Sequence, residues 1–200
     1  MTFSPISLIL ELDKQLDIDD LDEFRDIVSA SLRRREVGLQ EDAKLLKDMD
    51  EERNMYADAF ESKIESRWSL VNDIKELSGQ LTIVALFRQV ELHTKRIVKK
   101  KLPWVDASSL FSLKAFRTLL PFEIDALPGF NAFNELRLLN NAAKHQGKVT
   151  KELSKAFPLW PLDQDLSELD NAYDRLKVEV AEYVAQFVSE CYRHAQSPKA

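Results

Sequence analysis

One side of the segment 134–149 carries side chains that could bind an anion and move a proton. If the segment is helical, four polar side chains fall about one turn apart along that side. They are Asn134, Arg137, Asn141 and His145. Amides and guanidinium groups donate hydrogen bonds to phosphate oxygens, and an imidazole can exchange a proton near neutral pH. The pattern is therefore typical of a surface that contacts phosphate.

The opposite side of the same segment is apolar, and we expect it to face a core. Its residues are Ala132, Leu136, Leu139 and Ala143, with Phe133 and Ala142 beside them. Asn131 is placed to cap such a helix, and Gly147 can adopt the left-handed conformation that ends one. An ordinary surface helix end, whose polar side chains satisfy the last carbonyls and water, is the simpler interpretation of the polar side.

The composition predicts a helical scaffold for this surface. The chain has 200 residues, of which 44% are hydrophobic, and this is enough for one sizeable core. Leu, Ala, Glu, Lys and Arg are abundant, whereas glycine occurs only four times, at positions 38, 79, 129 and 147. An all-α fold follows. The glycines are too far apart for a Rossmann fingerprint or a phosphate loop, so nucleotide binding by those motifs is excluded.

The cysteine and histidine content argues against a metal centre. Cys191 is the single cysteine, so no intramolecular disulfide can form. It lies one helical turn from His194, but no second pair of ligands completes a zinc site. We therefore expect Cys191 on the surface of a C-terminal helix, with no metal and no cofactor.

The charge and the N-terminus suggest a soluble, cytoplasmic protein with no membrane partner. The first residues lack a basic leader, and no apolar stretch is long enough to span a bilayer. The formal net charge of −6 disfavours a general nucleic-acid coat protein. Two basic runs, 33–35 and 95–101, are most simply explained as solvated helix ends.

The N-terminal part should contain two short helices and one long helical segment. The short helices are expected over about 4–15 and 19–36, the second of them ended by Gly38. The segment 39–77 contains no Pro or Gly and would be roughly 55 to 60 Å long as one helix. A compact domain of this length is only roughly 40 Å across. The segment therefore either breaks near residues 50–54 and folds back, or forms an arm that binds a second subunit.

The remaining segments complete a bundle. The expected elements are a helix over 80–101 ended by Pro103, short helices and loops over 103–130, an irregular linker over 156–162 and a last helix over 165–194. Leu81, Val84 and Phe87 are expected to face inward in the first of these helices. The inner side of the last helix should hold Leu166, Leu169, Tyr173, Leu176, Val180, Val184 and Phe187. The predicted organisation is N-terminal helices over 1–38, a helical bundle over 39–194 and a disordered tail over 195–200.

The run RLLNNAAKHQGKV, preceded by VELHTKRIVKKKL, resembles the HEPN superfamily of prokaryotic helical bundles. That family has an Arg, usually a polar residue next, and then a His, with four to six residues between the Arg and the His. Asn141 and His145 match the polar residue and the His, but Asn140 stands where the Arg should be, and Arg137 lies one turn earlier. The resemblance implies four or five core helices, dimerisation and, often, a metal-independent endoribonuclease of toxin–antitoxin or phage-defence systems.

The resemblance also suggests a role for each polar residue. His145 would be the acid and base, Arg137 the phosphate clamp, and Asn141 the residue that orients either group. RNA binding would involve Lys144, Asn140 and Asn134, and Glu91 would support the site by orienting His145 or Arg137.

Two other functions are compatible with the sequence. One is a non-catalytic binding or regulatory module that dimerises or neutralises a partner protein; Leu138, an apolar residue on the polar side, would fit burial under such a partner. The other is a dimerising arm over 39–77, with the bundle as its support. The expected partners are therefore a second copy of the chain, RNA, and a cognate antitoxin or regulatory protein.

Overall fold

The computed structural model describes residues 5–47, 54–145 and 147–195. Within these ranges the regular structure is helical, with one isolated bridge between Lys148 and Asp165 and no strand. The elements are α1 (Pro5–Lys14), α2 (Asp19–Lys47), α3 (Asn54–Lys101), η2 (Ala107–Ser109), α4 (Leu113–Leu119), η3 (Ile124–Ala126), α5 (Phe130–His145), α6 (Lys151–Ala156) and α7 (Leu169–Ala195). The all-α prediction is confirmed. None of the described helices combines the length and the apolar character that a bilayer crossing requires.

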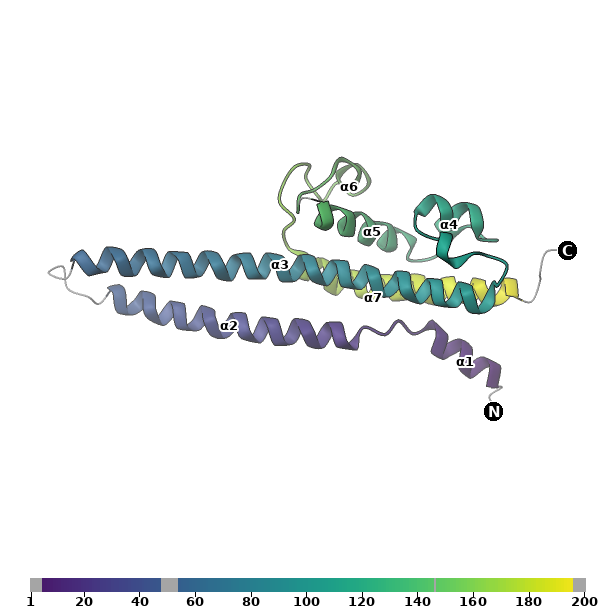
Figure 1. Ribbon diagram of the computed structural model, residues 1–200, viewed down its shortest axis with the longest axis horizontal. Coiled ribbons are helices and arrows are strands. Elements are labelled where there is room, and N and C mark those ends of the chain that lie inside the picture. The colour runs from purple at the N-terminus through teal and green to yellow at the C-terminus, as the bar shows by residue number, and fades with distance from the viewer. Residues whose placement is uncertain (1–4, 48–53, 146, 196–200) are drawn as a thin grey trace.

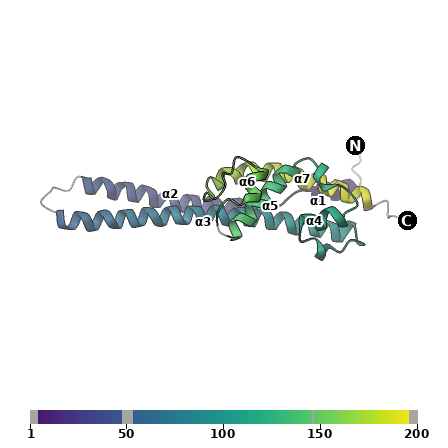
Figure 2. The same cartoon turned by 90° about the horizontal axis from the view of Figure 1, so that it is seen from above.

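The helices form a bundle with a two-helix arm (Figure 1). The N-terminal half of α3 and most of α2 lie antiparallel and extend away from the rest of the chain. The C-terminal half of α3 packs against α7 and α5, while α1 lies along the end of α7. The short helices α4 and α6 lie over the bundle near the two ends of α5 (Figure 2). Long core helices with an N-terminal helical extension agree with the sequence-based expectation.

Neither Gly38, which was expected to end a helix, nor Gly79, which falls between the helical segments expected over 39–77 and 80–101, interrupts a helix. Gly38 lies inside α2, which continues to Lys47, and Gly79 lies inside α3. A helix-interior glycine costs only about 1 kcal/mol relative to alanine, and packing between α2 and α3 can outweigh this cost. Gly79 also has a packing role, because a β-carbon there would lie 3.0 Å from the Cβ atom of Leu169 at the start of α7.

The segment 39–77 is therefore shared between α2 and α3, and the domain boundary placed at residue 38 falls inside α2. The break expected near residues 50–54 coincides largely with 48–53, which lie outside the described residues, as does the tail from residue 196. Because α2 and α3 pack side by side, the chain does fold back on itself, although the resulting hairpin extends away from the bundle.

The arm has a small core of its own. Leu32, Leu39 and Val71 are buried between α2 and α3, and Val28, Trp68 and Ile74 pack around them. Two ion pairs connect the helices, one between Arg67 Nη1 and Asp42 Oδ2 at 3.2 Å and one between Lys75 Nζ and Glu36 Oε1 at 3.9 Å. These pairs are largely exposed and add little to stability.

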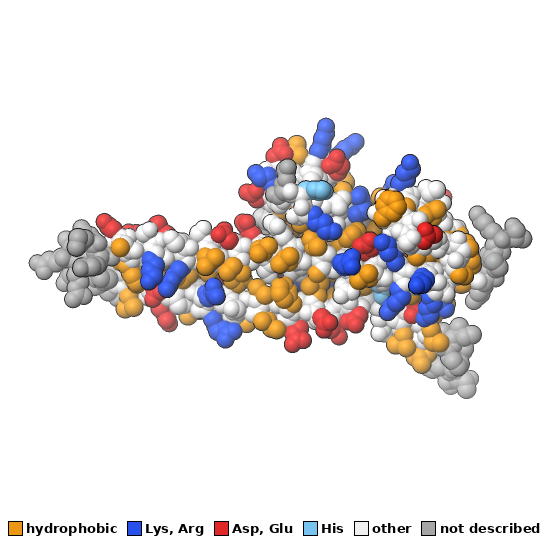
Figure 3. Space-filling model, viewed as in Figure 1, with side chains coloured by type: hydrophobic (Ala, Val, Ile, Leu, Met, Phe, Trp, Pro, Cys, Tyr) orange, Lys and Arg blue, Asp and Glu red, His pale blue; other side chains and the backbone are white. Residues whose placement is uncertain are grey.

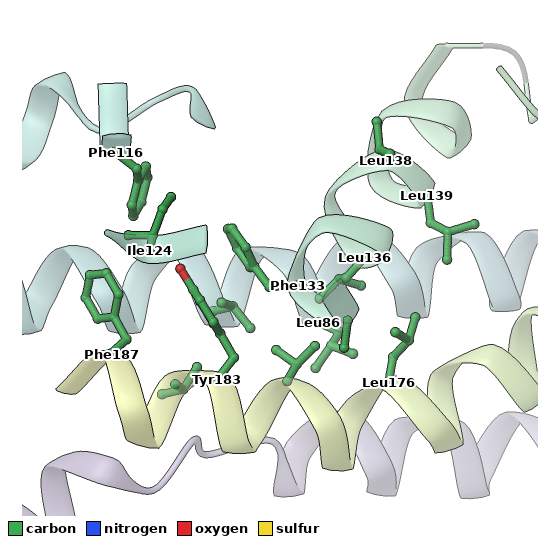
Figure 4. Packing of buried hydrophobic residues seen from close by; sticks show 14 of the residues in the cluster. Leu86, Phe116, Ile124, Phe133, Leu136, Leu138, Leu139, Leu176, Tyr183 and Phe187 are labelled. Atoms are coloured by element: carbon green, nitrogen blue, oxygen red, sulfur yellow. The ribbon is translucent and has the colours of Figure 1, made fainter. Parts of the chain in front are cut away.

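The bundle core is centred on α7 and α5 (Figure 4). The rings of Tyr183 and Phe133 stack with their centroids 4.5 Å apart, and Phe187 and Phe116 extend the cluster. Every residue predicted for the inner side of the last helix is buried. In the helix over 80–101, however, Leu81 is 50% exposed, and Ile83 and Leu86 face the core instead.

Two further expectations about single residues are wrong. Cys191 is fully buried rather than on a helix surface, because α7 turns it toward the core. Burial raises the pKa of its thiol well above the ordinary range. Asn131 does not cap α5: the helix begins at Phe130, and the carbonyl of Gly129 accepts the amide of Phe133.

The N-terminal helix is attached through the carboxylate of Asp13. One of its oxygens accepts hydrogen bonds from Lys100 Nζ and from Tyr192 Oη, both at 2.6 Å. Burial alone would raise the pKa of Asp13, but these two bonds outweigh it and hold the pKa below the usual value of 3.8. Burial, together with the bond to Asp13, raises the pKa of Tyr192 to about 12.

Because the pKa of Asp13 is lower in the folded state, its contribution to stability should be present above pH 3.8 and be lost as the pH falls through the folded-state pKa. We expect the Asp13→Asn variant to be less stable than wild type by about 1 to 2 kcal/mol at neutral pH. The difference should shrink as the pH falls below the ordinary pKa of the carboxyl. Urea unfolding of both proteins over a pH series measures this; a difference that does not change with pH would contradict the assignment.

Candidate functional site

A pocket of about 310 Å³ lies between α5, the C-terminal half of α3 and the chain leading into α4. Five of the seven residues predicted for the site line it, namely Glu91, Arg137, Asn140, Asn141 and Lys144. The other walls are mostly apolar and aromatic, from Phe87, Leu110, Phe111, Leu113, Phe116 and Phe133. We call this feature the Arg137 pocket. Polar and apolar side chains line it in similar shares, so it suits a ligand that has both an apolar part and polar groups.

Arg137 is a half-buried cation with no carboxylate partner among the described ion pairs. Asn134, one turn earlier on α5, accepts hydrogen bonds from its Nε at 3.2 Å and from its Nη2 at 2.8 Å. Burial, followed by repulsion from Arg117, lowers the pKa of Arg137, although a guanidinium stays charged at neutral pH. Arg117 itself pairs with Asp125, at 2.8 Å from Nε to Oδ2. An anion from solution would supply the counter-charge that Arg137 lacks.

Asn140 lies deeper than the sequence pattern indicated. Its side chain is only 2% exposed, and its Nδ2 donates to Asn141 Oδ1 at 3.3 Å. Its Oδ1 is buried without a hydrogen-bond partner in the described part of the chain. An unsatisfied buried acceptor costs about 1 to 3 kcal/mol. Asn141, by contrast, is exposed at the pocket rim beside Lys144.

His145 is exposed at the last position of α5 and does not line the Arg137 pocket. It lies eight positions beyond Arg137, which is about 12 Å along the helix axis. Within one copy of the chain, the imidazole and the guanidinium are therefore not brought to one phosphate group. The proton-transfer residue and the anion-binding residues predicted from the sequence lie at different points of the same helix.

Glu91 and Leu138 occupy different surroundings from those expected. Glu91 is half-buried in the Arg137 pocket, but its carboxylate accepts from Lys95 Nζ at 2.7 Å rather than bonding to Arg137 or His145. Leu138 is only 6% exposed, because residues of the same chain cover it. Its burial therefore gives no support to a partner protein on this face.

The elements around the pocket carry a strong positive charge. Residues 80–150 contain eleven Lys and Arg but only five Asp and Glu, although the whole chain has a net charge of −6. Figure 3 shows Lys and Arg side chains spread over the surface that α4, α5 and the end of α3 form. The basic run 95–101 supplies part of this excess, and a count over the whole segment would have found the rest. Lys114 and Arg117 were missed for this reason.

An aromatic side chain at the pocket could bind a nucleobase. Phe111 lines the pocket and is 79% exposed, which is unusual for a phenylalanine. A phenyl ring in this position offers a face on which a base can stack. The residue lies in an irregular segment between η2 and α4, and no periodic pattern in the sequence distinguishes it.

Comparisons with known proteins returned no matching family model, no matching curated protein and no matching solved structure. Among the residues that the structure describes, no group of three or more His, Cys, Asp or Glu side chains could hold a metal ion.

Glu135 holds α5 against neighbouring segments on the helix side opposite the Arg137 pocket. It is 5% exposed and accepts hydrogen bonds from Trp160 Nε1 at 2.8 Å and from Arg175 Nη2 at 2.7 Å. It thereby connects α5 to the segment after α6 and to α7. The bonded residues are 25 and 40 positions apart in the sequence, so helical periodicity does not predict either bond.

We expect Glu135→Ala to lower the free energy of unfolding by about 2 to 3 kcal/mol, because two donors lose their charged acceptor. Glu179→Ala is the matched control, since Glu179 also contacts Arg175, at 3.5 Å, but is 46% exposed. That change should cost less than about 0.5 kcal/mol. Chemical denaturation measures both. Similar losses in the two variants would show that the buried position of Glu135 has no special role.

Proposed function

We propose that this protein is a non-catalytic helical module that binds single-stranded RNA through the Arg137 pocket. The observation that carries the proposal is Arg137 itself, a half-buried guanidinium with no carboxylate partner in the described part of the chain. Phosphate is a natural counter-ion, because a guanidinium donates to it in a planar, bidentate geometry.

Two further features favour a single strand over a duplex. The aromatic pocket walls suit an unstacked base, and in a duplex the bases are stacked on one another. The exposed ring of Phe111 would stack on such a base, while Arg137 and Lys144 bind the adjacent phosphates. The positive segment 80–150 would attract the backbone in spite of the acidic chain.

The position of His145 supports binding rather than cleavage. A general base must come within hydrogen-bond reach of the 2′-hydroxyl while a cation stabilises the same phosphate. At about 12 Å along α5 from Arg137, His145 does not meet this condition in one copy. A displacement much smaller than this lowers catalytic rates by orders of magnitude.

A metal-independent endoribonuclease of toxin–antitoxin or phage-defence type is the second candidate. It is favoured by the exposed imidazole of His145, for which the described residues supply no hydrogen bond or ion pair. In this case the Arg137 of a second copy would have to act on the same phosphate. Membership of the HEPN superfamily and the existence of a cognate antitoxin stay predictions.

One pair of experiments separates these functions. Fluorescence anisotropy should show binding of a labelled single-stranded RNA that is tighter than binding of its duplex and weakens steeply as salt is raised. Incubation of a mixed RNA pool with wild type and with His145→Ala should leave the RNA intact in both. Absence of binding at low salt would refute the proposal. Cleavage by wild type that His145→Ala abolishes would replace it with the second candidate.

A further inference from the structure

One face of the arm is apolar and is not covered by the described residues of the chain. On α3 the spacing of Leu70, Ile74, Leu77 and Leu81 alternates between four and three residues, as in the contact stripe of a coiled coil. The three leucines are 50%, 55% and 50% exposed, and Ile74 is half-buried. On α2, Ile27 and Leu45 are each 62% exposed and fall on the helix side that carries Gly38. We call these residues, together with Gly38, the arm face.

The two parts of the arm face lie on the same side of the hairpin. A groove of about 430 Å³ between the helices is lined by Gly38 and Leu39 from α2 and by Leu70 and Val71 from α3. On the other side, α2 is held to the bundle by Arg25, which pairs with Asp174 of α7 at 2.7 Å. Figure 3 shows hydrophobic side chains gathered over α2 and α3 toward the base of the arm.

Gly38 is a glycine inside a helix that contacts within the chain do not explain. A β-carbon at this position would meet nothing within 4 Å, so neither a turn nor packing inside the chain requires glycine there. A glycine inside a helix is nevertheless unfavourable. Lack of a side chain allows another backbone to approach closely, which would explain a glycine on an otherwise apolar helix face.

We propose that the arm face is the interface with a second copy of this chain, so that two arms form a four-helix bundle. Such a cover would add apolar burial to the arm, whose described part has few buried apolar side chains of its own, namely Leu32, Leu39, Ile64 and Val71. The face from Ile27 to Leu45 is about 27 Å long and two helices, roughly 20 Å, wide. Two copies would therefore bury on the order of 1,000 Å², which is the lower end for a specific dimer.

The charges around the groove favour a second copy over an unrelated protein. Arg35 and Arg67 line the groove together with Glu41 and Asp42, so its charges balance. A patch of balanced charge can complement itself after a two-fold rotation, as an isologous interface requires. A partner chosen by charge would instead leave an excess of one sign on this surface.

The oligomeric state of the purified full-length chain tests the proposal. Sedimentation velocity over a concentration series should show a monomer–dimer equilibrium for wild type. The double variant Leu70→Glu, Leu77→Glu should be monomeric throughout that series with unchanged helical circular dichroism, because both side chains are already exposed. Val178→Glu is the matched control, since Val178 is 67% exposed on α7, and it should dimerise like wild type.

If the double variant does not fold, Gly38→Glu provides a second test of the interface. Glutamate favours helix and fits the open space at this position, so the unfolding temperature of the monomer should not fall. Two like charges buried in the interface should nevertheless raise the dimer dissociation constant about tenfold or more. A wild type that is monomeric up to its solubility limit, or dimers that persist in these variants, would overturn the proposal.

Discussion

Replacing Arg137 with methionine should weaken RNA binding about 10- to 100-fold, the range expected for loss of a charge-assisted contact to phosphate. The free energy of unfolding of this variant should equal or exceed that of wild type. Burial and repulsion from Arg117 lower the pKa of Arg137, and both effects disfavour the charged group in the folded protein. Methionine keeps the length of the apolar stem without the charge. Opposite effects on binding and stability would distinguish a ligand-binding residue from a structural one.

Arg33→Met is the matched control for this experiment. Arg33 is exposed on the arm in the basic run 33–35, so its removal changes the net charge equally but leaves the Arg137 pocket intact. We expect its dissociation constant for RNA to change less than about threefold. Anisotropy titrations at fixed salt measure both variants. Equal losses would mean that RNA binds through general charge and not at the pocket.

Gly129→Ala should destabilise the protein by about 3 to 5 kcal/mol, much more than Gly147→Ala, although both glycines have a left-handed backbone. Their φ angles are +75° and +66°, so an added methyl group costs each position about 1 to 2 kcal/mol. At Gly129 the new β-carbon would also lie 2.6 Å from the carbonyl oxygen of Glu179 and 2.8 Å from the amide nitrogen of Tyr183. The backbone of α7 cannot move away without opening the core.

At Gly147 the nearest atom is Nε2 of Gln80, 3.0 Å from the new β-carbon. Since that atom ends a flexible side chain, Gln80 can rotate, and the loss should stay near about 1 to 2 kcal/mol. Urea unfolding of the two variants gives the comparison. Losses that agree within about 0.5 kcal/mol would show that close packing of Gly129 on α7 contributes little.

The candidate site was only partly predictable. The helical spacing of Arg137, Asn141 and Lys144 correctly placed them beside one another, and they line one pocket. The same spacing grouped His145 with them through steps of one turn, but a step of four residues turns about 40° too far. After two such steps His145 lies about 80° around the helix from Arg137, whereas Lys144 lies only about 20° from it. Phe111 and Arg117 come from segments that only the folded chain brings to α5.

The amino-acid sequence by itself determined the local features of this protein. The all-α composition, the buried side of α7, the end of α3 before Pro103 and the left-handed Gly147 all follow from interactions within a few residues. Backbone geometry and periodic burial act over one or two helical turns, so a short stretch of sequence contains the necessary information.

Only the tertiary structure decided where helices continue and what surrounds each side chain. Gly38 and Gly79 stay helical because contacts between α2, α3 and α7 outweigh a local preference of about 1 kcal/mol. Asn140 and Cys191 are buried, and Leu81 is exposed, because neighbouring helices cover some sides of α3, α5 and α7 and not others. These contacts join residues far apart in the chain, and no local pattern specifies which helix faces meet.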